Sequence, residues 1–317
     1  MSAVAAPGEA GATATATAPR RGRHHLSDRV RAERRLALWL VGPAAIVMIA
    51  VTAYPIVDTI VLSLQRADLR FPGASKWVGL GNYGAVLRSN VWWQDVGHTM
   101  IITVIAVSIQ FVLGMLLAIA MHRTLVARGL LRSVALIPYG IVAVVSAYSW
   151  NYAWSLTSGW IPKLLGLTGD PLSHQFGTYV AIIVTEIWKN TPFMALLLLA
   201  GLALVPDELH EAAKVDGASA WQRFWRITIP LMMPAILVAL LFRTLDEVRI
   251  FDVIYIFNQG ANGTESISML NYSTLLDRLN LGLGSAVSVL LFVLVGIIAF
   301  LFIKGFGAGA GPSGKRA

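Results

Sequence analysis

The sequence predicts an all-α, polytopic membrane protein with six transmembrane helices. Hydrophobic residues make up 56% of the chain and charged residues only 13%, whereas a soluble domain is typically about 25% charged. Six apolar segments, each of about 20 residues or more, are long enough to cross roughly 30 Å of hydrocarbon. Because backbone groups find no water there, these segments are expected to be helices.

The expected elements follow one another along the chain. Residues 1–34 are expected to be a disordered basic tail, because Ala, Gly, Thr and Pro dominate its first half and supply no core. The membrane domain is expected at 35–305, with helices at about 36–62, 98–121, 131–154, 178–203, 231–252 and 284–304. A polar segment at 204–230 separates the fourth and fifth helices, and 306–317 form a second tail.

The positions of lysine and arginine predict the orientation, because basic residues are enriched on the cytoplasmic side. One side has 16 of the 25: Arg20, Arg21, Arg23, Arg29, Arg31, Arg34, Arg35, Arg123, Arg128, Arg132, Lys214, Arg223, Arg226, Lys304, Lys315 and Arg316. The other side has Arg66, Arg70, Lys76, Arg88, Lys163 and Arg278. Both termini and the 204–230 segment are therefore expected in the cytoplasm. This topology explains the net charge of +8 without a nucleic-acid partner.

The 204–230 segment is expected to form two short helices at the membrane face. Asp207 can cap the first helix, and Gly217 can end it. The spacing of Trp221, Phe224 and Trp225 puts their rings on one face of the second helix. Pro230 then opens the next apolar run, where a missing N–H costs nothing.

The same segment resembles the coupling loop of ABC importer permeases. Glu211-Ala212-Ala213, three residues, Gly217, nine residues, Ile227, one residue and Ile229-Pro230 keep every spacing of that motif, with Ile229 where Leu is usual. By this resemblance, the residues that meet a partner ATPase are Glu211, Ala212, Ala213, Asp216, Gly217 and Pro230.

Further runs are similar to the carbohydrate branch of the same family. They are LVGPAAIVMIAVTAYPIVDTIVLSL (40–64), VGLGNYGAVL (78–87) and RIFDVIYIFNQGANG (249–263). The last departs from the branch's FD-x-I-Y-x-x-T-x-GGP pattern, with Asn258 for Thr and Ala261-Asn262 for Gly-Pro. MHRTL (121–125), LIPYGIV (136–142), AYSWNYAW (147–154) and 202–221 resemble trehalose permeases of this branch. The resemblance implies import of a disaccharide, with trehalose as the favoured candidate.

The resemblance also implies the partners. They are a second permease subunit, two cytoplasmic ATPase subunits that bind ATP and Mg, and an extracytoplasmic substrate-binding lipoprotein. This chain is expected to sit in the plasma membrane, with no cofactor, metal or catalytic residue of its own.

Ionisable residues inside spans are costly and usually face a cavity or one another. Spacings of i, i+3 and i+4 put each of two groups on one helix face, and aromatic and amide groups of the third span lie at a similar depth. The candidate pathway residues are Glu186, Lys189 and Asn190; Arg243, Asp246 and Glu247; and Asn151, Tyr152 and Trp154. Two structural alternatives remain: ion pairs that hold helices together, and an interfacial aromatic belt.

Two other function classes remain. One is an importer of another solute class, such as amino acids or polyamines. The other is a membrane-embedded enzyme, which would need paired catalytic groups. Gly309, Gly314 and Lys315 have P-loop spacing, but Arg316 replaces Ser or Thr, and a glycine-rich tail explains the match.

Overall fold

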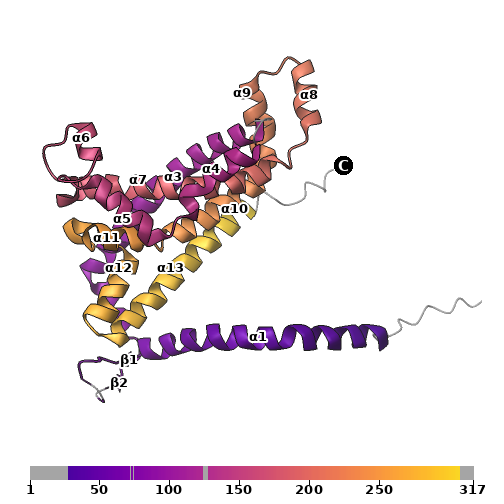
Figure 1. Ribbon diagram of the computed structural model, residues 1–317. Coiled ribbons are helices and arrows are strands. Elements are labelled where there is room, and N and C mark those ends of the chain that lie inside the picture. The colour runs from indigo at the N-terminus through magenta and orange to yellow at the C-terminus, as the bar shows by residue number, and fades with distance from the viewer. Residues whose placement is uncertain (1–27, 72, 74, 124–127, 308–317) are drawn as a thin grey trace, which may run out of the picture. The chain divides into compact units, whose positions relative to one another are not determined.

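The computed structural model describes residues 28–71, 73, 75–123 and 128–307, and most of these are helical (Figure 1). The α-helices are α1 (Asp28–Ser63), α2 (Gly81–Arg88), α3 (Asn90–Arg123), α4 (Arg128–Gly140), α5 (Ala143–Trp154), α6 (Ile161–Leu165), α7 (Gln175–Leu202), α8 (Asp207–Val215), α9 (Ala220–Arg223), α10 (Ile229–Glu247), α11 (Asp252–Asn258), α12 (Ile267–Tyr272) and α13 (Leu281–Gly307). Two short strands, β1 (Gln65–Arg66) and β2 (Lys76–Trp77), pair antiparallel with Gln65 opposite Trp77.

Shorter helical turns join these elements. Pro171–Ser173 and Ala261–Gly263 are 3₁₀ turns, and Phe224–Thr228 and Ser273–Asp277 are π-helical turns. The first π turn leads directly into α10 and the second follows α12, so both lie at the ends of longer helices.

The structure confirms the all-α membrane fold. Within the described residues, five helical stretches are long and apolar enough to span a bilayer: Arg35–Ser63, Asn90–His122, Gln175–Leu202, Ala220–Asn258 and Leu281–Gly305. The pair α4 and α5 supplies a sixth span if it is counted as one. Exposed apolar side chains along α13, such as Phe292 and Phe300, suit a hydrocarbon surround.

The third span is not the single helix expected over 131–154. It is broken at Ile141 and Val142, and its two parts meet at 89°. Val142 is extended, with φ −57° and ψ 136°, and Pro138 lies just before the break. Lys189 of α7 donates a hydrogen bond to the Ile141 carbonyl, 2.7 Å away. A side chain therefore satisfies backbone that the break frees inside the span.

Helix ends also differ from the expected boundaries. α1 begins at Asp28, so residues 28–34, expected to be tail, are helical. Arg, Ala and Glu are good helix formers and extend the apolar helix outward. α3 begins at Asn90 rather than near 98, whereas α10 ends at Glu247 rather than near 252. Residues 1–27 and 308–317, including the Gly309–Arg316 match, lie outside the described residues.

The described chain divides between Pro55 and Ile56 into two units. Residues 28–55 of the first unit are the N-terminal part of α1. The second unit has three apolar clusters: one joins α3, α7 and α10, one joins α5, α7 and α11, and one joins α2, α12 and α13.

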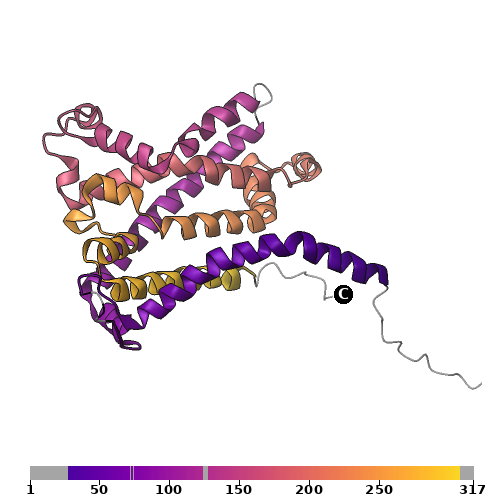
Figure 2. The same cartoon turned by 60° about the horizontal axis from the view of Figure 1, so that its bottom comes forward.

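Within the second unit, α3 and α7 lie side by side along much of their length (Figures 1 and 2). Gly114 of α3 permits this approach: a Cβ there would lie 2.7 Å from Met194 Cγ and 3.2 Å from the Ala195 nitrogen of α7. These two helices carry several of the polar side chains of the membrane domain.

Candidate functional site

Arg243 of α10 is the centre of a polar cluster inside the membrane domain. Its guanidinium donates hydrogen bonds to Asp246 and, at 2.6 Å, to Glu247 Oε2, one turn further along the helix. A third bond, of 3.0 Å, runs from Arg243 Nε to Gln110 Oε1 of α3. The expected shared face on α10 is therefore present, and it is tied to a neighbouring helix.

Gln110 extends the cluster to α7. Its side-chain nitrogen donates to the main-chain oxygen of Glu186 at 3.2 Å and to Glu247 Oε2 at 3.4 Å. On α7 the Asn190 amide donates to Glu186 Oε2 at 2.6 Å. Sequence reasoning missed Gln110, although an amide in the middle of an apolar run was a usable signal.

A cavity of 220 Å³ lies beside this cluster, where α7, α10 and α11 meet the first residue of α5. Glu186, Lys189, Asn190, Asp246 and Glu247 are in its lining, together with Ala143 and residues 249–253. Five of the nine candidate pathway residues therefore converge on one cavity.

The cluster has a buried side and an open side. Arg243 and Glu247 are 1% and 2% exposed, so they pair inside the packed chain. The Asp246 side chain is 70% exposed, although it shares the same arginine. Asp246 is thus the member of the ion-paired group that a solute can reach.

The third-span candidates do not join that cavity. The Asn151 amide donates to the main-chain oxygens of Ile256 and Phe257, at 3.3 and 3.4 Å, and so ties α5 to α11. Trp154 is buried in the apolar cluster that joins α5, α7 and α11, whereas Tyr152 is exposed. None of the three is in the lining of the 220 Å³ cavity.

The coupling-loop residues form an exposed helix and a tight turn. α8 has no buried residue, and Glu211 and Ala212 are exposed on it. Gly217 has a φ of 78°. The Ala218 N–H bonds to the Ala213 oxygen at 2.9 Å, and the Gly217 N–H bonds to the Lys214 oxygen at 3.0 Å. This pattern ends a helix with a left-handed glycine.

The start of α8 differs from the expectation. Pro206 occupies the N-cap position, without a side-chain cap, and Asp207 is the first helical residue. Asp207 therefore does not cap the helix; its carboxylate lies in the first turn, where the helix dipole favours negative charge.

The second half of the loop forms the expected aromatic group. A reciprocal capping box between Ser219 and Gln222 starts α9. The rings of Trp221, Phe224 and Trp225 contact one another, with centroids 5.3 to 6.2 Å apart. Pro230 lies at the start of α10, in line with its expected position.

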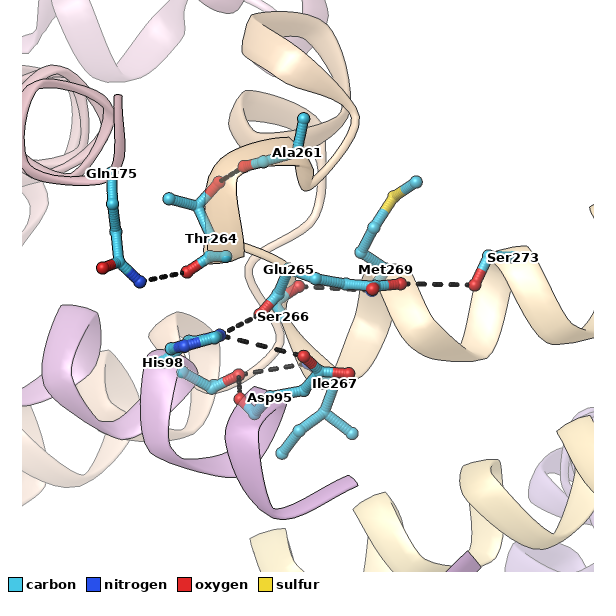
Figure 3. Close-up of polar contacts among 12 residues, drawn as sticks. Asp95, His98, Gln175, Ala261, Thr264, Glu265, Ser266, Ile267, Met269 and Ser273 are labelled. Carbon is cyan, nitrogen blue, oxygen red and sulfur yellow. Dashed lines mark hydrogen bonds and ion pairs between the residues drawn. The ribbon is translucent and has the colours of Figure 1, made fainter. Parts of the chain in front are cut away.

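A separate group of polar residues connects the segment between α11 and α12 to α3 and α7 (Figure 3). His98 Nδ1 lies 3.3 Å from the main-chain oxygen of Glu265 and 3.8 Å from Asp95 Oδ1. The Ile267 N–H donates to Thr99 Oγ1 at 3.1 Å, and Gln175 donates to the Gly263 oxygen at 2.7 Å. Burial raises the pKa of the Glu265 carboxyl, while a hydrogen bond from Ser273 opposes this rise.

The loop residues that differ from the carbohydrate-branch pattern have defined structural roles in this segment. The Asn258 amide donates to the Ala261 oxygen at 2.9 Å, and its oxygen accepts from the Gly260 N–H at 3.1 Å. Asn262 has a φ of 60°, and its side chain donates to the Leu172 oxygen at 3.1 Å. Proline, with φ fixed near about −65°, cannot adopt that conformation.

Comparison with known proteins adds the family. Residues 77–308 match the model of "Binding-protein-dependent transport system inner membrane component". The "Trehalose transport system permease protein SugA" of Mycobacterium tuberculosis (strain ATCC 25618 / H37Rv) is 54% identical over 287 residues, which cover 90% of this chain and 94% of that protein. The "Trehalose/maltose transport system permease protein MalF" of Thermococcus litoralis is 39% identical over 285 residues, 86% of this chain and 94% of that protein.

A solved structure shares the fold. A chain from the crystal structure of a bacterial ABC transporter involved in the import of the acidic polysaccharide alginate matches with a TM-score of 0.76 and 21% identity, over 90% of this chain and all of that one. The family match covers most of the chain, and its members are transporter subunits rather than enzymes. The chain therefore belongs to the inner membrane components of binding-protein-dependent transport systems.

Proposed function

We propose that this chain is the permease subunit of an ABC importer for a disaccharide, and that trehalose is the favoured substrate. The observation that carries the proposal is the similarity to two permeases that are both named for trehalose, at 54% and 39% identity over most of each chain. The chain forms half of the transmembrane pathway and carries out no covalent chemistry.

The 220 Å³ cavity supports a neutral, hydroxyl-rich solute. Its lining has charges of both signs, with Lys189 and Arg249 among Glu186, Asp246, Glu247 and Asp252, and Arg243 lies behind them. Mixed charges and amides offer donors and acceptors to hydroxyl groups. The volume is below the roughly 300 Å³ at which ligand pockets usually begin, as expected of one half of a site that a second subunit completes.

The remaining partners belong to the same proposal. A second, related permease completes the pathway, two cytoplasmic ATPase subunits bind ATP and Mg, and a lipoprotein delivers the sugar outside. α8 supports the ATPase contact because it is exposed and has no buried residue of its own. With the termini in the cytoplasm, α8 faces the ATPases. ATP and Mg bind to those subunits, so this chain needs no cofactor of its own.

Uptake by a strain lacking its own copy of this gene tests the proposal. The strain carrying this chain and its partners should take up labelled trehalose, and unlabelled trehalose should compete better than other disaccharides. A labelled amino acid and a labelled polyamine test the other solute classes. Uptake of either one, without uptake of any disaccharide, would overturn the proposal.

A further inference from the structure

A second cavity, of 460 Å³, lies between the coupling loop and the ends of α3 and α7. It shares no lining residue with the 220 Å³ cavity. Its lining is Ile119, His122, Leu202, Val205, Asp207, His210, Lys214, Ala220, Arg223, Phe224 and Thr228. Helices far apart in the sequence thus line one cavity.

The polar part of this lining is basic. α3 contributes His122, α8 contributes His210 and Lys214, and α9 contributes Arg223. Asp207 is the single carboxylate in the lining, so the cavity is positive even when both histidines are neutral. Among the described residues, neither Lys214 nor Arg223 forms an ion pair. One guanidinium N–H of Arg223 donates to the Ala218 oxygen at 3.2 Å, and its other donors have no hydrogen-bond partner within the described part of the chain.

The apolar part of the lining includes the end of α7 and an aromatic ring of the loop. Leu202 and Val205 are buried. The ring of Phe224 lies against Trp221 and Trp225, which are 69% and 51% exposed. Exposed indoles are typical of the head-group level of a bilayer. Phe224 thus joins the cationic lining of the cavity to two exposed indoles.

We propose that this cavity binds a phosphate group, held by Lys214 and Arg223 with His122 and His210 beside them. The arginine fork matches phosphate oxygens bidentately, and lysine adds a point charge. The phosphate belongs either to an anionic phospholipid or to a soluble phosphate compound, and the neighbouring tryptophans favour the lipid. A bound phosphate joins α8 and α9 to the end of α3, so it ties the coupling loop to the membrane domain.

Native mass spectrometry of the full chain, purified in detergent, tests the site with phosphatidylglycerol and phosphatidylcholine as probes. The wild type should retain phosphatidylglycerol in preference to phosphatidylcholine. Lys214→Gln with Arg223→Gln should weaken phosphatidylglycerol binding by about fivefold for each lost charge. Arg226→Gln is the matched control, because Arg226 lies in the same loop and is not in the lining of this cavity. Lys214→Arg with Arg223→Lys keeps both charges and should retain binding.

Inorganic phosphate, tested by isothermal titration at constant ionic strength, separates the two sources. Binding of phosphatidylglycerol that depends on Lys214 and Arg223 supports a lipid site. Binding of inorganic phosphate alone, with the same dependence, supports a site for a soluble phosphate compound. The proposal fails if neither probe distinguishes the wild type from the double Gln variant, or if Arg226→Gln weakens binding as much. Equal thermal unfolding of all variants establishes that they are folded.

Discussion

Arg243 serves two carboxylates whose surroundings differ. The Glu247 side chain is fully buried, while the Asp246 side chain is mostly exposed. Breaking a buried ion pair leaves an uncompensated charge and costs about 3–5 kcal/mol, whereas an exposed pair contributes about 0–1 kcal/mol. One arginine therefore combines a structural contact with a contact at the surface of the cavity.

Substitutions at Arg243 and Asp246 should separate these two contacts. Arg243→Met should lower the free energy of unfolding by about 3–5 kcal/mol, because Glu247 and Gln110 lose their buried partner. Asp246→Asn should cost less than about 1 kcal/mol but reduce sugar uptake, because Asp246 is in the cavity lining. Thermal unfolding in detergent and uptake in cells measure the two effects.

The double variant Arg243→Met with Glu247→Met is the control for the buried pair. Apolar residues of similar volume can replace a buried pair at little cost, so much of the lost stability should return. Wild-type uptake by Asp246→Asn would show that the cavity is not on the pathway. Wild-type stability of Arg243→Met would show that neither the buried pair within α10 nor the bond from Arg243 to Gln110 of α3 stabilises the fold.

At the scale of elements, the contact between α3 and α7 depends on a missing side chain at Gly114. Gly114→Ala should lower stability by about 1–3 kcal/mol, because the new methyl group meets buried Met194 and the α7 backbone. Gly97→Ala on the same helix is the control, since no atom lies within 4 Å of its added Cβ. Equal unfolding temperatures for the two variants would contradict the close-packing explanation.

The turn at Gly217 depends on conformation rather than on space. A Cβ at this position meets nothing within 4 Å, but the φ of 78° disfavours side chains. Gly217→Val should strain the turn by about 1–2 kcal/mol and weaken co-purification of the ATPase while membrane insertion stays normal. Gly217→Asn should be milder, because asparagine adopts this conformation more readily. Normal ATPase recovery and uptake with Gly217→Val would contradict a coupling role.

The sequence predicted elements well where the apolar pattern was uninterrupted. The helical spans and the two-part loop before α10 follow from run length, glycine and proline. The broken third span did not follow, because its apolar run continues through Ile141 and Val142. The carbonyl of Ile141 at the break bonds to Lys189, and this contact is made only in the folded chain. α3 starts early for a similar reason: Asp95 and Thr99 are polar in the sequence but buried in the fold.

The sequence predicted which helices carry the candidate site but not the contacts between those helices. Helical spacing identified the groups on α7 and α10, but Gln110, which joins them, lies on a third helix. The direction of a side chain across helices depends on their packing, which one sequence does not specify. For the same reason Asn151 and Trp154, at a suitable depth, contact α11 or the core instead of the cavity.

At the scale of the whole molecule, the described residues contain one loop that resembles the coupling motif, and the proposed sugar cavity of 220 Å³ is small. In the proposed assembly, two ATPase subunits need two such loops, and we propose that a second, different permease supplies the other loop in a pseudo-twofold pair. Expression of this chain with the ATPase and binding protein alone should give no uptake, and addition of the second permease should restore it. Full uptake without the second permease would indicate a homodimer.

The turn at 258–264 limits how this chain can be recombined with its relatives. Its shape depends jointly on the Asn258 amide and on the left-handed backbone at Asn262. Proline placed alone at 262 would be excluded by the backbone, and threonine placed alone at 258 would lack the amide donor that bonds Ala261. A chimera therefore has to exchange 258–264 as one block, together with position 175, because the Gln175 side chain donates to the Gly263 oxygen. Position 172 can stay, because Asn262 bonds only the main-chain oxygen of Leu172.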